Sequence, residues 1–198
     1  MIRLAILVSG GGSNMQAIVN STKNGILKGI AEVVLVISNN VNAYALQRAK
    51  KENIKSVCVQ KKIFADLKDF NNNILQELLN EKIDLICLAG YMMLVDDNII
   101  NNYEGKILNI HPSLLPKFAG KGMYGHYVHE AVIKAKENKS GATVHFVEKD
   151  YDTGKVILQK EVDVFDKDLP ENLAKRVLDL EHQIYPQAIK KVIEDKFR

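Results

Sequence analysis

Short apolar runs alternate with amphipathic segments along the first 110 residues of the chain. Each run is too short for a helix and is typical of a buried parallel strand. The runs cover residues 2–8, 33–38, 56–60, 83–90 and 107–110. Apolar residues at helical spacing predict the intervening helices, which start near residue 13, cover about 43–53 and 66–81, and end near 103. This alternation predicts a right-handed, parallel, doubly wound sheet.

The pattern changes after Pro116. Residues 117–125 are rich in glycine and lysine and are expected to form a mobile surface loop, and helices are expected near 126–138 and 170–195. Two strand-like stretches, 142–147 and 155–165, follow each other without a helix between them. We therefore expect them to be antiparallel. The predicted fold class is α/β, with a mainly parallel doubly wound sheet and antiparallel strands toward the C-terminus, in a single domain over residues 1–198.

Composition and charge narrow the class of protein. The chain has 198 residues, is 46% hydrophobic and carries a formal charge of +3, with dispersed basic residues, so no nucleic-acid partner is predicted. Cys58 and Cys87 each lie inside an apolar run, and we expect both to be buried thiols in a reducing compartment. No segment approaches 18 apolar residues, so we expect no membrane association and a cytoplasmic, soluble protein.

A glycine-rich turn follows the first predicted strand. It reads Ser-Gly-Gly-Gly-Ser-Asn over residues 9–14. Ser13 or Asn14 can cap the following helix, whose free N–H groups favour an anion such as phosphate. The turn is neither a Walker A loop nor a G-x-G-x-x-G motif, because no Gly-Lys-Ser/Thr follows and residue 15 is Met. Taken alone, it fits a tight connection without a ligand equally well.

An amide and an imidazole stand two residues apart at the end of the fifth predicted strand. Strand alternation places Asn109 and His111 on one side of it. Pro112 then ends the strand, because proline cannot donate to a sheet ladder. In an open α/β sheet, the ends of the strands are where ligands bind. A turn amide and a satisfied histidine are the alternative explanation for this pair.

Four motifs taken together resemble the glycinamide ribonucleotide transformylase family. They are SGGGSN at 9–14, LAGYM at 89–93, LNIHPSLLP at 108–116 and GATVHFVEKDYDTG at 141–154. The motifs occur in the order of the family and span most of the chain. The resemblance implies a Rossmann-like formyltransferase fold, with a nucleotide-binding half over residues 1–110 and a folate-binding and catalytic half over 111–198. It also implies formyl transfer from 10-formyltetrahydrofolate to the amine of glycinamide ribonucleotide (GAR), without a metal.

The resemblance assigns the catalytic roles to Asn109, His111 and Asp152. An amide N–H of Asn109 and a donor of His111 would stabilise the oxyanion that forms when the amine attacks the formyl carbon. His111 would also move the proton that leaves the amine. Asp152 would orient the imidazole and favour its protonated form by charge pairing. His145 matches a histidine near the centre of the family's site. An ordinary turn aspartate and a buried strand histidine are the alternatives for these last two residues.

The resemblance also assigns residues that bind the two small-molecule substrates. For GAR, they are Gly12, Ser13, Asn14 and Glu181, the last of which would otherwise be a solvated helix glutamate. For the folate, they are Met92, Met93, Leu94, Val95, Asn109, Glu148, Lys149, Asp150, Tyr151 and Lys68. The chain departs from the family at Met93 and Leu67, where many members carry Arg, and its loop 121–125 is longer than in the shortest members. The quaternary state is expected to be a monomer or a homodimer.

Other readings compete with this one. Formyltetrahydrofolate hydrolases carry an additional N-terminal domain and a different residue after the histidine, and tRNA formyltransferases carry an additional C-terminal domain, so both are disfavoured. A noncatalytic nucleotide-binding module is the alternative from another class, because doubly wound folds host many functions. An NAD-dependent oxidoreductase is less favoured, because Ser38-Asn39-Asn40 stands where an acidic residue is expected.

Overall fold

A computed structural model describes residues 1–197. The strands are β1 (Ile2–Val8), β2 (Ala31–Ser38), β3 (Lys55–Cys58), β4 (Leu85–Leu88), β5 (Ile107–His111), β6 (Lys139–Phe146) and β7 (Val156–Asp163). The helices are α1 (Ser13–Asn24), α2 (Tyr44–Lys51), the 3₁₀ turn η1 (Lys61–Ile63), α3 (Leu67–Asn80), α4 (Asp97–Asn102), α5 (His126–Lys134) and α6 (Pro170–Lys196). The strands are hydrogen-bonded in the order β3-β2-β1-β4-β5-β6-β7. The predicted α/β class with a mixed sheet is confirmed.

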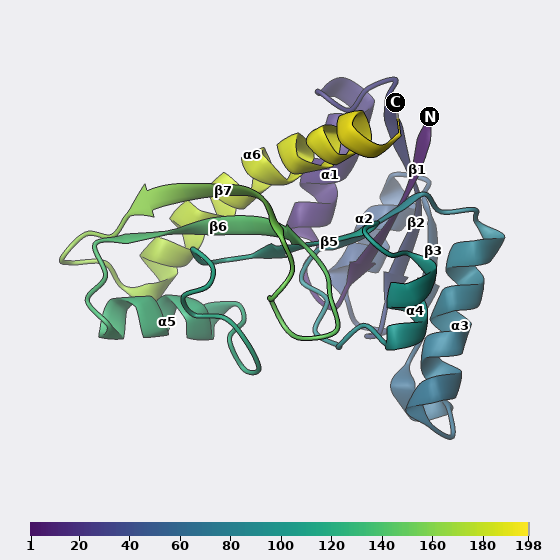
Figure 1. The fold of residues 1–198 in the computed structure, drawn as a ribbon, viewed down its shortest axis with the longest axis horizontal. Helices are drawn as coiled ribbons and strands as arrows, with labels where there is room; N and C mark the ends of the chain where they lie inside the picture. Colours follow the sequence, from purple (N-terminus) through teal and green to yellow (C-terminus); the bar gives the residue numbers. More distant parts are fainter. Residues whose placement is uncertain (198) are drawn as a thin grey trace. The chain divides into compact units, whose positions relative to one another are not determined.

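The chain divides into two compact units, Met1–Leu108 and Asn109 onward, so β5 contributes to both. In the first unit, β1 pairs in parallel with β2 and with β4, and β2 pairs in parallel with β3. Helices α1 and α2 pack together on one face, and α3 and α4 pack together on the other (Figure 1). Residues 4–8 of β1 are fully buried between these layers, as expected for a central parallel strand.

The second unit is built on an antiparallel pair. Strands β6 and β7 pair over Lys139↔Asp163 to His145↔Val156, with a register shift between Val144 and His145. Helix α6 runs along both strands and contacts α5 (Figure 1). Its buried face includes Leu173, Val177, Ile184 and Tyr185. This apolar stripe is what holds the long helix against the strand pair.

Several details differ from the sequence predictions. Helix α1 starts at Ser13 with Gly12 as its N-cap, and no side-chain cap bond is made, so neither Ser13 nor Asn14 is the cap residue. The N-cap position has a φ of 72°, in the left-handed region, and glycine adopts this conformation more readily than other residues. Cys87 is buried as expected, but Cys58 is only half-buried. It lies in β3, an edge strand of the sheet that pairs only with β2 among the described strands.

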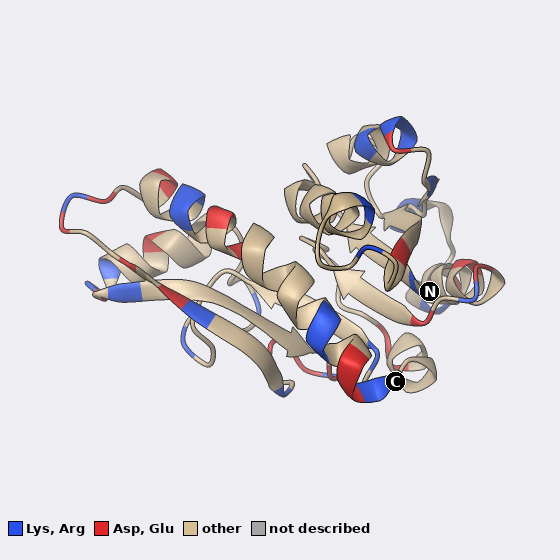
Figure 2. Cartoon of the chain, turned by 90° about the horizontal axis from the view of Figure 1, so that it is seen from above, with Lys and Arg blue, Asp and Glu red and all other residues tan. Residues whose placement is uncertain are grey.

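Charged residues of both signs are interspersed along the elements. Along α6, basic and acidic side chains follow each other at short intervals (Figure 2). None of the helices within residues 1–197 is long and apolar enough to cross a membrane.

Candidate active site

Three polar side chains of the second unit converge on one carboxylate oxygen of a fourth, Asp152. Asp152 Oδ1 lies 3.5 Å from Asn109 Nδ2, 3.5 Å from His111 Nδ1 and 3.6 Å from His145 Nε2. All three partners come from strands: Asn109 and His111 from β5 and His145 from β6. Two residues predicted only from the resemblance, Asp152 and His145, are therefore brought together with the pair at the end of β5. We call these four residues the Asp152 cluster.

The turn between β6 and β7 carries Asp152 to the cluster. Asp152 has a φ of 57°, in the left-handed region that aspartate adopts more readily than most residues. Gly154 follows in the same turn, and a Cβ atom there would lie 1.8 Å from the carbonyl oxygen of Phe146. The Asp-Thr-Gly sequence is therefore needed for this path of the chain: glycine permits the close approach, and aspartate accepts the left-handed turn.

Hydrogen bonding fixes the proton positions of His145. Its Nδ1 lies 2.8 Å from the carbonyl oxygen of Phe146, which only accepts, so Nδ1 carries a hydrogen. In the neutral ring, Nε2 then accepts the Asn109 amide at 3.1 Å. The other amide hydrogen of Asn109 has only the 3.5 Å contact with Asp152, which is long for a hydrogen bond. It is thus the donor that Asn109 can offer to a reacting oxygen.

The loop after β5 holds the other two members of the cluster. His111 Nε2 lies 2.8 Å from the carbonyl oxygen of Phe118, and the backbone N–H of Gly120 donates to Asp152 Oδ2 at 3.0 Å. Since the Phe118 carbonyl only accepts, Nε2 of His111 carries a hydrogen, and Nδ1 faces the carboxylate. Phe118 has a φ of 55°, so the loop reaches the imidazole through a left-handed residue.

Burial and charge act against each other at these groups. Burial lowers the pKa of His111 and exceeds the opposing effects of Asp152 and the Phe118 carbonyl, while His145 lowers the pKa further. Burial alone would raise the pKa of Asp152, but contact with His145, the charge of His111 and the Gly120 amide bring it below its ordinary value. At neutral pH the cluster therefore holds an ionised carboxylate beside a neutral imidazole that is able to accept a proton at Nδ1.

This arrangement supplies the components of acyl transfer to an amine. A neutral imidazole nitrogen beside a carboxylate is a proton acceptor, and the carboxylate stabilises the cation that results. The Asn109 amide offers a donor for a developing oxyanion. The two histidines of the cluster are buried, at 4% exposure for His111 and 2% for His145, and Asn109 and Asp152 are half-buried, so charges here act more strongly than they would in water.

In the first unit, α2 shapes the glycine turn. The Ala45 N–H donates to the Gly10 carbonyl at 3.1 Å, and Arg48 Nε donates to the Gly11 carbonyl at 2.9 Å. A Cβ atom on Gly12 would lie 2.6 Å from that of Ala45, so the close packing requires glycine. With the carbonyls of Gly10 and Gly11 bound in this way, the first N–H groups of α1 are the polar groups that the turn can present to an anion.

Ser9 links the turn to the loops that follow β2 and β4. Its Oγ donates to Asn39 Oδ1 at 2.7 Å and accepts the Met92 N–H at 2.8 Å, and its N–H donates to Gly90 O at 3.0 Å. Met92 and Leu94 are 47% and 46% exposed, whereas Met93 is half-buried and Val95 is buried. The predicted apolar segment therefore offers two exposed side chains to a ligand, and the Met92 N–H is already bonded to Ser9.

The remaining predicted residues differ in exposure. Lys68 and residues 148–151 are exposed. Asn14 is 8% exposed at the start of α1, and Glu181 is 7% exposed within α6, so Glu181 is not a solvated surface glutamate. Sequence reasoning missed the backbone groups of Phe118 and Gly120, for which side-chain types give no signal. Within residues 1–197, no three His, Cys, Asp or Glu side chains gather to form a metal site.

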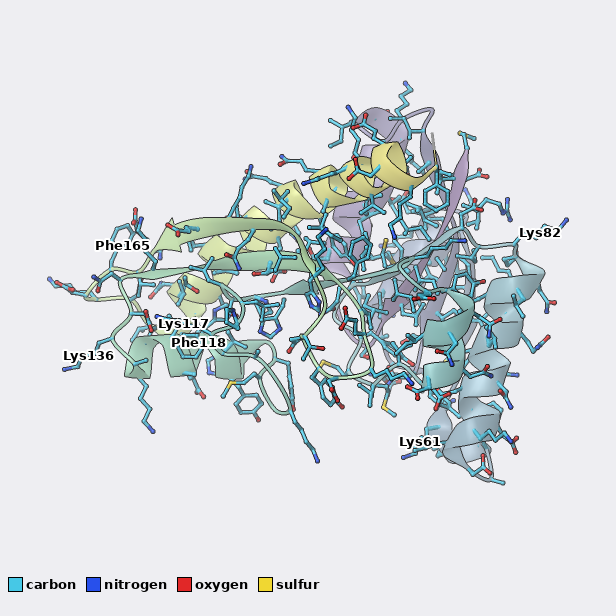
Figure 3. All side chains as sticks on the ribbon, viewed as in Figure 1. Lys61, Lys82, Lys117, Phe118, Lys136 and Phe165 are labelled. Carbon is cyan, nitrogen blue, oxygen red and sulfur yellow. The ribbon has the colours of Figure 1, made fainter. Side chains whose placement is uncertain are left out.

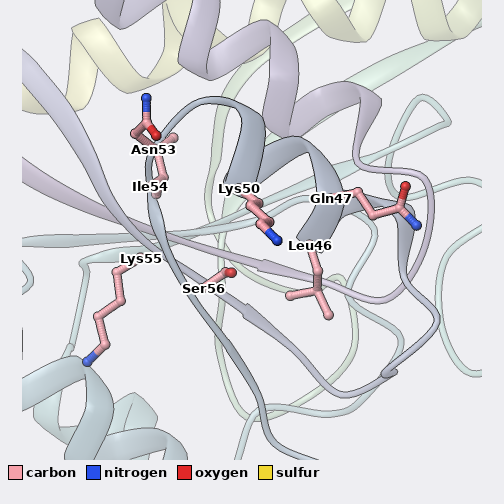
Figure 4. A pocket seen from close by; sticks show the side chains of 7 residues that line it. All are labelled: Leu46, Gln47, Lys50, Asn53, Ile54, Lys55 and Ser56. Atoms are coloured by element: carbon pink, nitrogen blue, oxygen red, sulfur yellow. The ribbon is translucent and has the colours of Figure 1, made fainter.

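An open hollow of about 550 Å³ lies elsewhere in the first unit, between α2 and the start of β3 (Figure 4). Leu46, Gln47, Lys50, Asn53, Ile54, Lys55 and Ser56 line it. None of these residues is among the predicted site residues, and Lys55 is paired with Glu77 of α3 and with Glu81, the C-cap residue of that helix. The hollow is therefore a surface depression separate from the residues described above.

Comparison with known proteins gives matches over nearly the whole chain. A family model described as formyl transferase matches residues 2–189. The phosphoribosylglycinamide formyltransferase of Haemophilus influenzae is 39% identical over 100% of this chain and 90% of its own length. The trifunctional purine biosynthetic protein adenosine-3 of Chironomus tentans is 38% identical over 96% of this chain, which spans only 14% of that protein.

Solved structures agree with the sequence matches. The crystal structure of phosphoribosylglycinamide formyltransferase from Bacillus halodurans aligns with a TM-score of 0.90 at 35% identity, over 99% of this chain and 97% of that one. The enzyme of that name from Brucella melitensis aligns with a TM-score of 0.88 at 41% identity, over 96% and 94%. The resemblance seen in the four motifs is thus confirmed over the full fold.

Proposed function

Since the chain belongs to the formyl transferase family, we propose that it moves the formyl group of 10-formyltetrahydrofolate to the amine of 5′-phosphoribosylglycinamide. The products are formyl-GAR and tetrahydrofolate, in the synthesis of purine nucleotides. The relatives of this name are matched over most of their length and support the choice of substrates. The single observation that supports the chemistry best is the Asp152 cluster, which joins a carboxylate, two imidazoles and an amide.

In the proposed mechanism, the amine attacks the formyl carbon to form a tetrahedral oxyanion. One amide hydrogen of Asn109 has only a long contact with Asp152, and in the mechanism it donates to the oxyanion instead. This hydrogen bond becomes stronger as negative charge develops on the oxygen. Nδ1 of His111 takes the proton released by the nitrogen, and the imidazolium pairs with Asp152. The same proton then passes to N10 of the folate as the carbon–nitrogen bond breaks. His145 holds the Asn109 amide in place.

Binding of GAR is assigned to Gly12, Ser13, Asn14 and Glu181. The phosphate suits the N-terminus of α1, because free N–H groups and the helix dipole favour an anion there. Glu181 would accept hydrogen bonds from the glycinamide or ribose end of the substrate, for which a carboxylate is the appropriate chemistry.

Folate binding is assigned to the apolar segment Met92–Val95, to Asn109, to residues 148–151 and to Lys68. A flat pterin ring needs an apolar surface, and Met92 and Leu94 expose one. Lys68 is exposed and supplies a cation for the glutamate tail in place of the Arg that many relatives carry at Met93 or Leu67. No metal takes part in the proposed reaction, and a cytoplasmic monomer or homodimer acting on these small molecules remains our prediction.

A steady-state assay tests this function. Purified protein is mixed with a 10-formyl folate analogue, with and without GAR, and release of the deformylated folate is followed by absorbance. The proposal predicts release that depends on GAR and disappears in His111→Ala. Release at the same rate without GAR would instead identify a hydrolase. If both ligands bind but no release occurs, the chain is a noncatalytic binding module, and the proposed activity is wrong.

A further inference from the structure

The segment that follows His111 is held by side chains rather than by a strand. Residues 112–117 have no ladder partner, so their backbone groups need other bonds. Ser113 Oγ donates to the Lys117 carbonyl at 2.7 Å, and Thr143 Oγ1 donates to the Ser113 carbonyl at 2.6 Å. The Leu115 N–H donates to Thr143 Oγ1 at 3.2 Å. One serine thus closes the segment on itself, and one threonine ties it to β6.

The bonds among Ser113, Leu115 and Thr143 are buried, and the bond from Ser113 to Lys117 is partly buried. Ser113 and Thr143 are both 0% exposed. A partly buried carbonyl that loses its donor is solvated only in part, so the Ser113 hydroxyl constrains the Lys117 carbonyl. A second serine of the same unit, Ser140, is also buried at 2% exposure, but its Oγ has no hydrogen-bond partner among the described residues. Of these two serine hydroxyls, the one on Ser113 holds a backbone carbonyl and the one on Ser140 does not.

The residue after Lys117 reaches the imidazole. Lys117 and Phe118 lie together in the loop beside α5 (Figure 3). Phe118 stands in a left-handed conformation, and its carbonyl oxygen lies 2.8 Å from His111 Nε2. The Lys117 carbonyl that Ser113 holds and the Phe118 carbonyl that contacts the imidazole belong to adjacent peptide units, which meet at the Cα atom of Phe118. A displacement of the first unit would therefore move the second and change its contact with His111.

The contact with Phe118 decides which ring nitrogen is basic. Asp152 lies 3.5 Å from Nδ1 and by itself favours a hydrogen on that nitrogen. The Phe118 carbonyl favours the hydrogen on Nε2 instead, which leaves the lone pair of Nδ1 facing the cluster. In the other tautomer, the basic nitrogen would face the loop and would be misplaced for taking a proton from an amine.

We propose that Ser113 is a positioning residue for His111. Its hydroxyl holds the Lys117 carbonyl, and so the position of the next peptide unit, whose Phe118 carbonyl selects the imidazole tautomer with hydrogen on Nε2. Thr143 supports this action by anchoring the carbonyl of Ser113 to β6. The role of Ser113 in turnover rests on the proposed function, whereas its effect on the tautomer is independent of which substrate the protein uses.

Nitrogen-15 NMR of the histidine rings tests the proposal without substrate. Spectra of the wild type, Ser113→Ala and Ser140→Ala are recorded at a pH about two units above the ordinary histidine pKa, so that the rings are neutral. We expect hydrogen on Nε2 of His111 in the wild type and in Ser140→Ala, and a shift toward hydrogen on Nδ1 in Ser113→Ala. An unchanged tautomer in Ser113→Ala would overturn the proposal.

Kinetics of the same variants provide the second readout. For Ser113→Ala we expect kcat to fall about tenfold, because one hydrogen bond is lost, while the KM values of both substrates stay within about twofold. Ser140→Ala should keep the wild-type kcat. Equal losses in the two variants would mean that any buried serine has this effect, and the role would be refuted. If Ser113→Ala does not fold, the same measurements are made on Ser113→Cys, in which a slightly larger thiol replaces the hydroxyl and donates weakly, and a smaller loss of kcat is expected.

The two proposals fail in different ways. A wild type without GAR-dependent transfer, but with the tautomer shift in Ser113→Ala, refutes the proposed function and supports the positioning role. A wild type that transfers the formyl group normally, with no tautomer shift and no loss of kcat in Ser113→Ala, refutes the positioning role alone.

Discussion

At the scale of single residues, the Asp152 cluster depends on how the two carboxylate oxygens of Asp152 divide their partners. Asp152 Oδ2 is occupied by the Gly120 N–H, so Oδ1 alone serves Asn109, His111 and His145. A single carboxylate oxygen thus links the proton acceptor to the amide donor. Removing the carboxylate charge should weaken both functions, because the imidazole and the amide face the same oxygen, although His145 and the Phe118 carbonyl still hold them.

Substitutions of His111 and Asp152 test this dependence. His111→Ala removes the proton acceptor, and Asp152→Asn removes the charge that stabilises the imidazolium, so we expect kcat to fall by about 10³ and about 10² respectively. Binding of both substrates, measured by calorimetry, should change little, because neither group is assigned to hold them tightly. Near-normal turnover in either variant would remove that residue from the mechanism.

Asn14 provides a contrasting prediction. It is buried near the N-terminus of α1, where the phosphate of GAR is assigned, so a bulky replacement such as Asn14→Leu should obstruct the nucleotide rather than the chemistry. We expect the KM for GAR to rise about tenfold or more, with kcat changed much less. An unchanged KM would show that the phosphate binds elsewhere.

At the scale of elements, the turn between β6 and β7 places Asp152 only because its glycine approaches the Phe146 carbonyl. Gly154→Ala would put a Cβ atom into that oxygen, so the turn must shift and the unfolding free energy should fall by about 1–3 kcal/mol. Urea unfolding measures the change. Gly10→Ala is the control for stability, because a Cβ atom there meets nothing within 4 Å. Equal stability of the two variants would contradict this explanation.

Helix α5 carries a buried histidine that should make the protein sensitive to acid. His129 is 4% exposed, its Nδ1 has no partner among the described residues, and burial together with the charges of His126 and His111 lowers its pKa to about 4. The unfolded chain, with an ordinary pKa of 6.5, therefore binds a proton that the folded chain does not bind between these values. Stability is complete above pH 6.5 and falls as the pH is lowered toward 4.

Unfolding in urea at pH 7.5 and at pH 5 measures this effect. Between these two pH values, His129 should contribute a loss on the order of 2 kcal/mol, and His111 adds to the loss because its pKa is also lowered. In His129→Leu, the pH dependence should be smaller. His126→Leu provides the comparison: His126 is exposed and its charge is only a secondary cause of the lowered pKa of His129, so this variant should change the pH dependence less than His129→Leu does. The same pH dependence in both variants would refute the role of His129.

At the scale of the whole molecule, periodicity predicted the order of the elements well. Strands and helices alternate as expected through β5, and the antiparallel pair β6–β7 and the helix α6 follow. Pro186 lies inside α6 without ending it, because packing of the flanking apolar residues outweighs the missing N–H. The turn η1 was not predicted, since three residues carry too little periodicity to be detected.

The site was predictable only in part. Strand alternation predicted that Asn109 and His111 share one side, but nothing in their local sequence indicates that Asp152 and His145 join them. That contact depends on the pairing of β6 with β7 and on two left-handed residues, Phe118 and Asp152. Only the family resemblance pointed to both side chains. The roles of the Phe118 carbonyl and of Ser113 became visible only once distances were known.

The central claim is that this cluster transfers a formyl group to an amine. A single-turnover experiment with a ¹³C-formyl donor, excess enzyme and GAR tests it most directly, with the product followed by NMR. The account predicts that the label appears in the amide of formyl-GAR in the wild type, and that Asp152→Asn forms the same product about 10² times more slowly. Label released as formate in the wild type, or transfer at an equal rate in the variant, would contradict it.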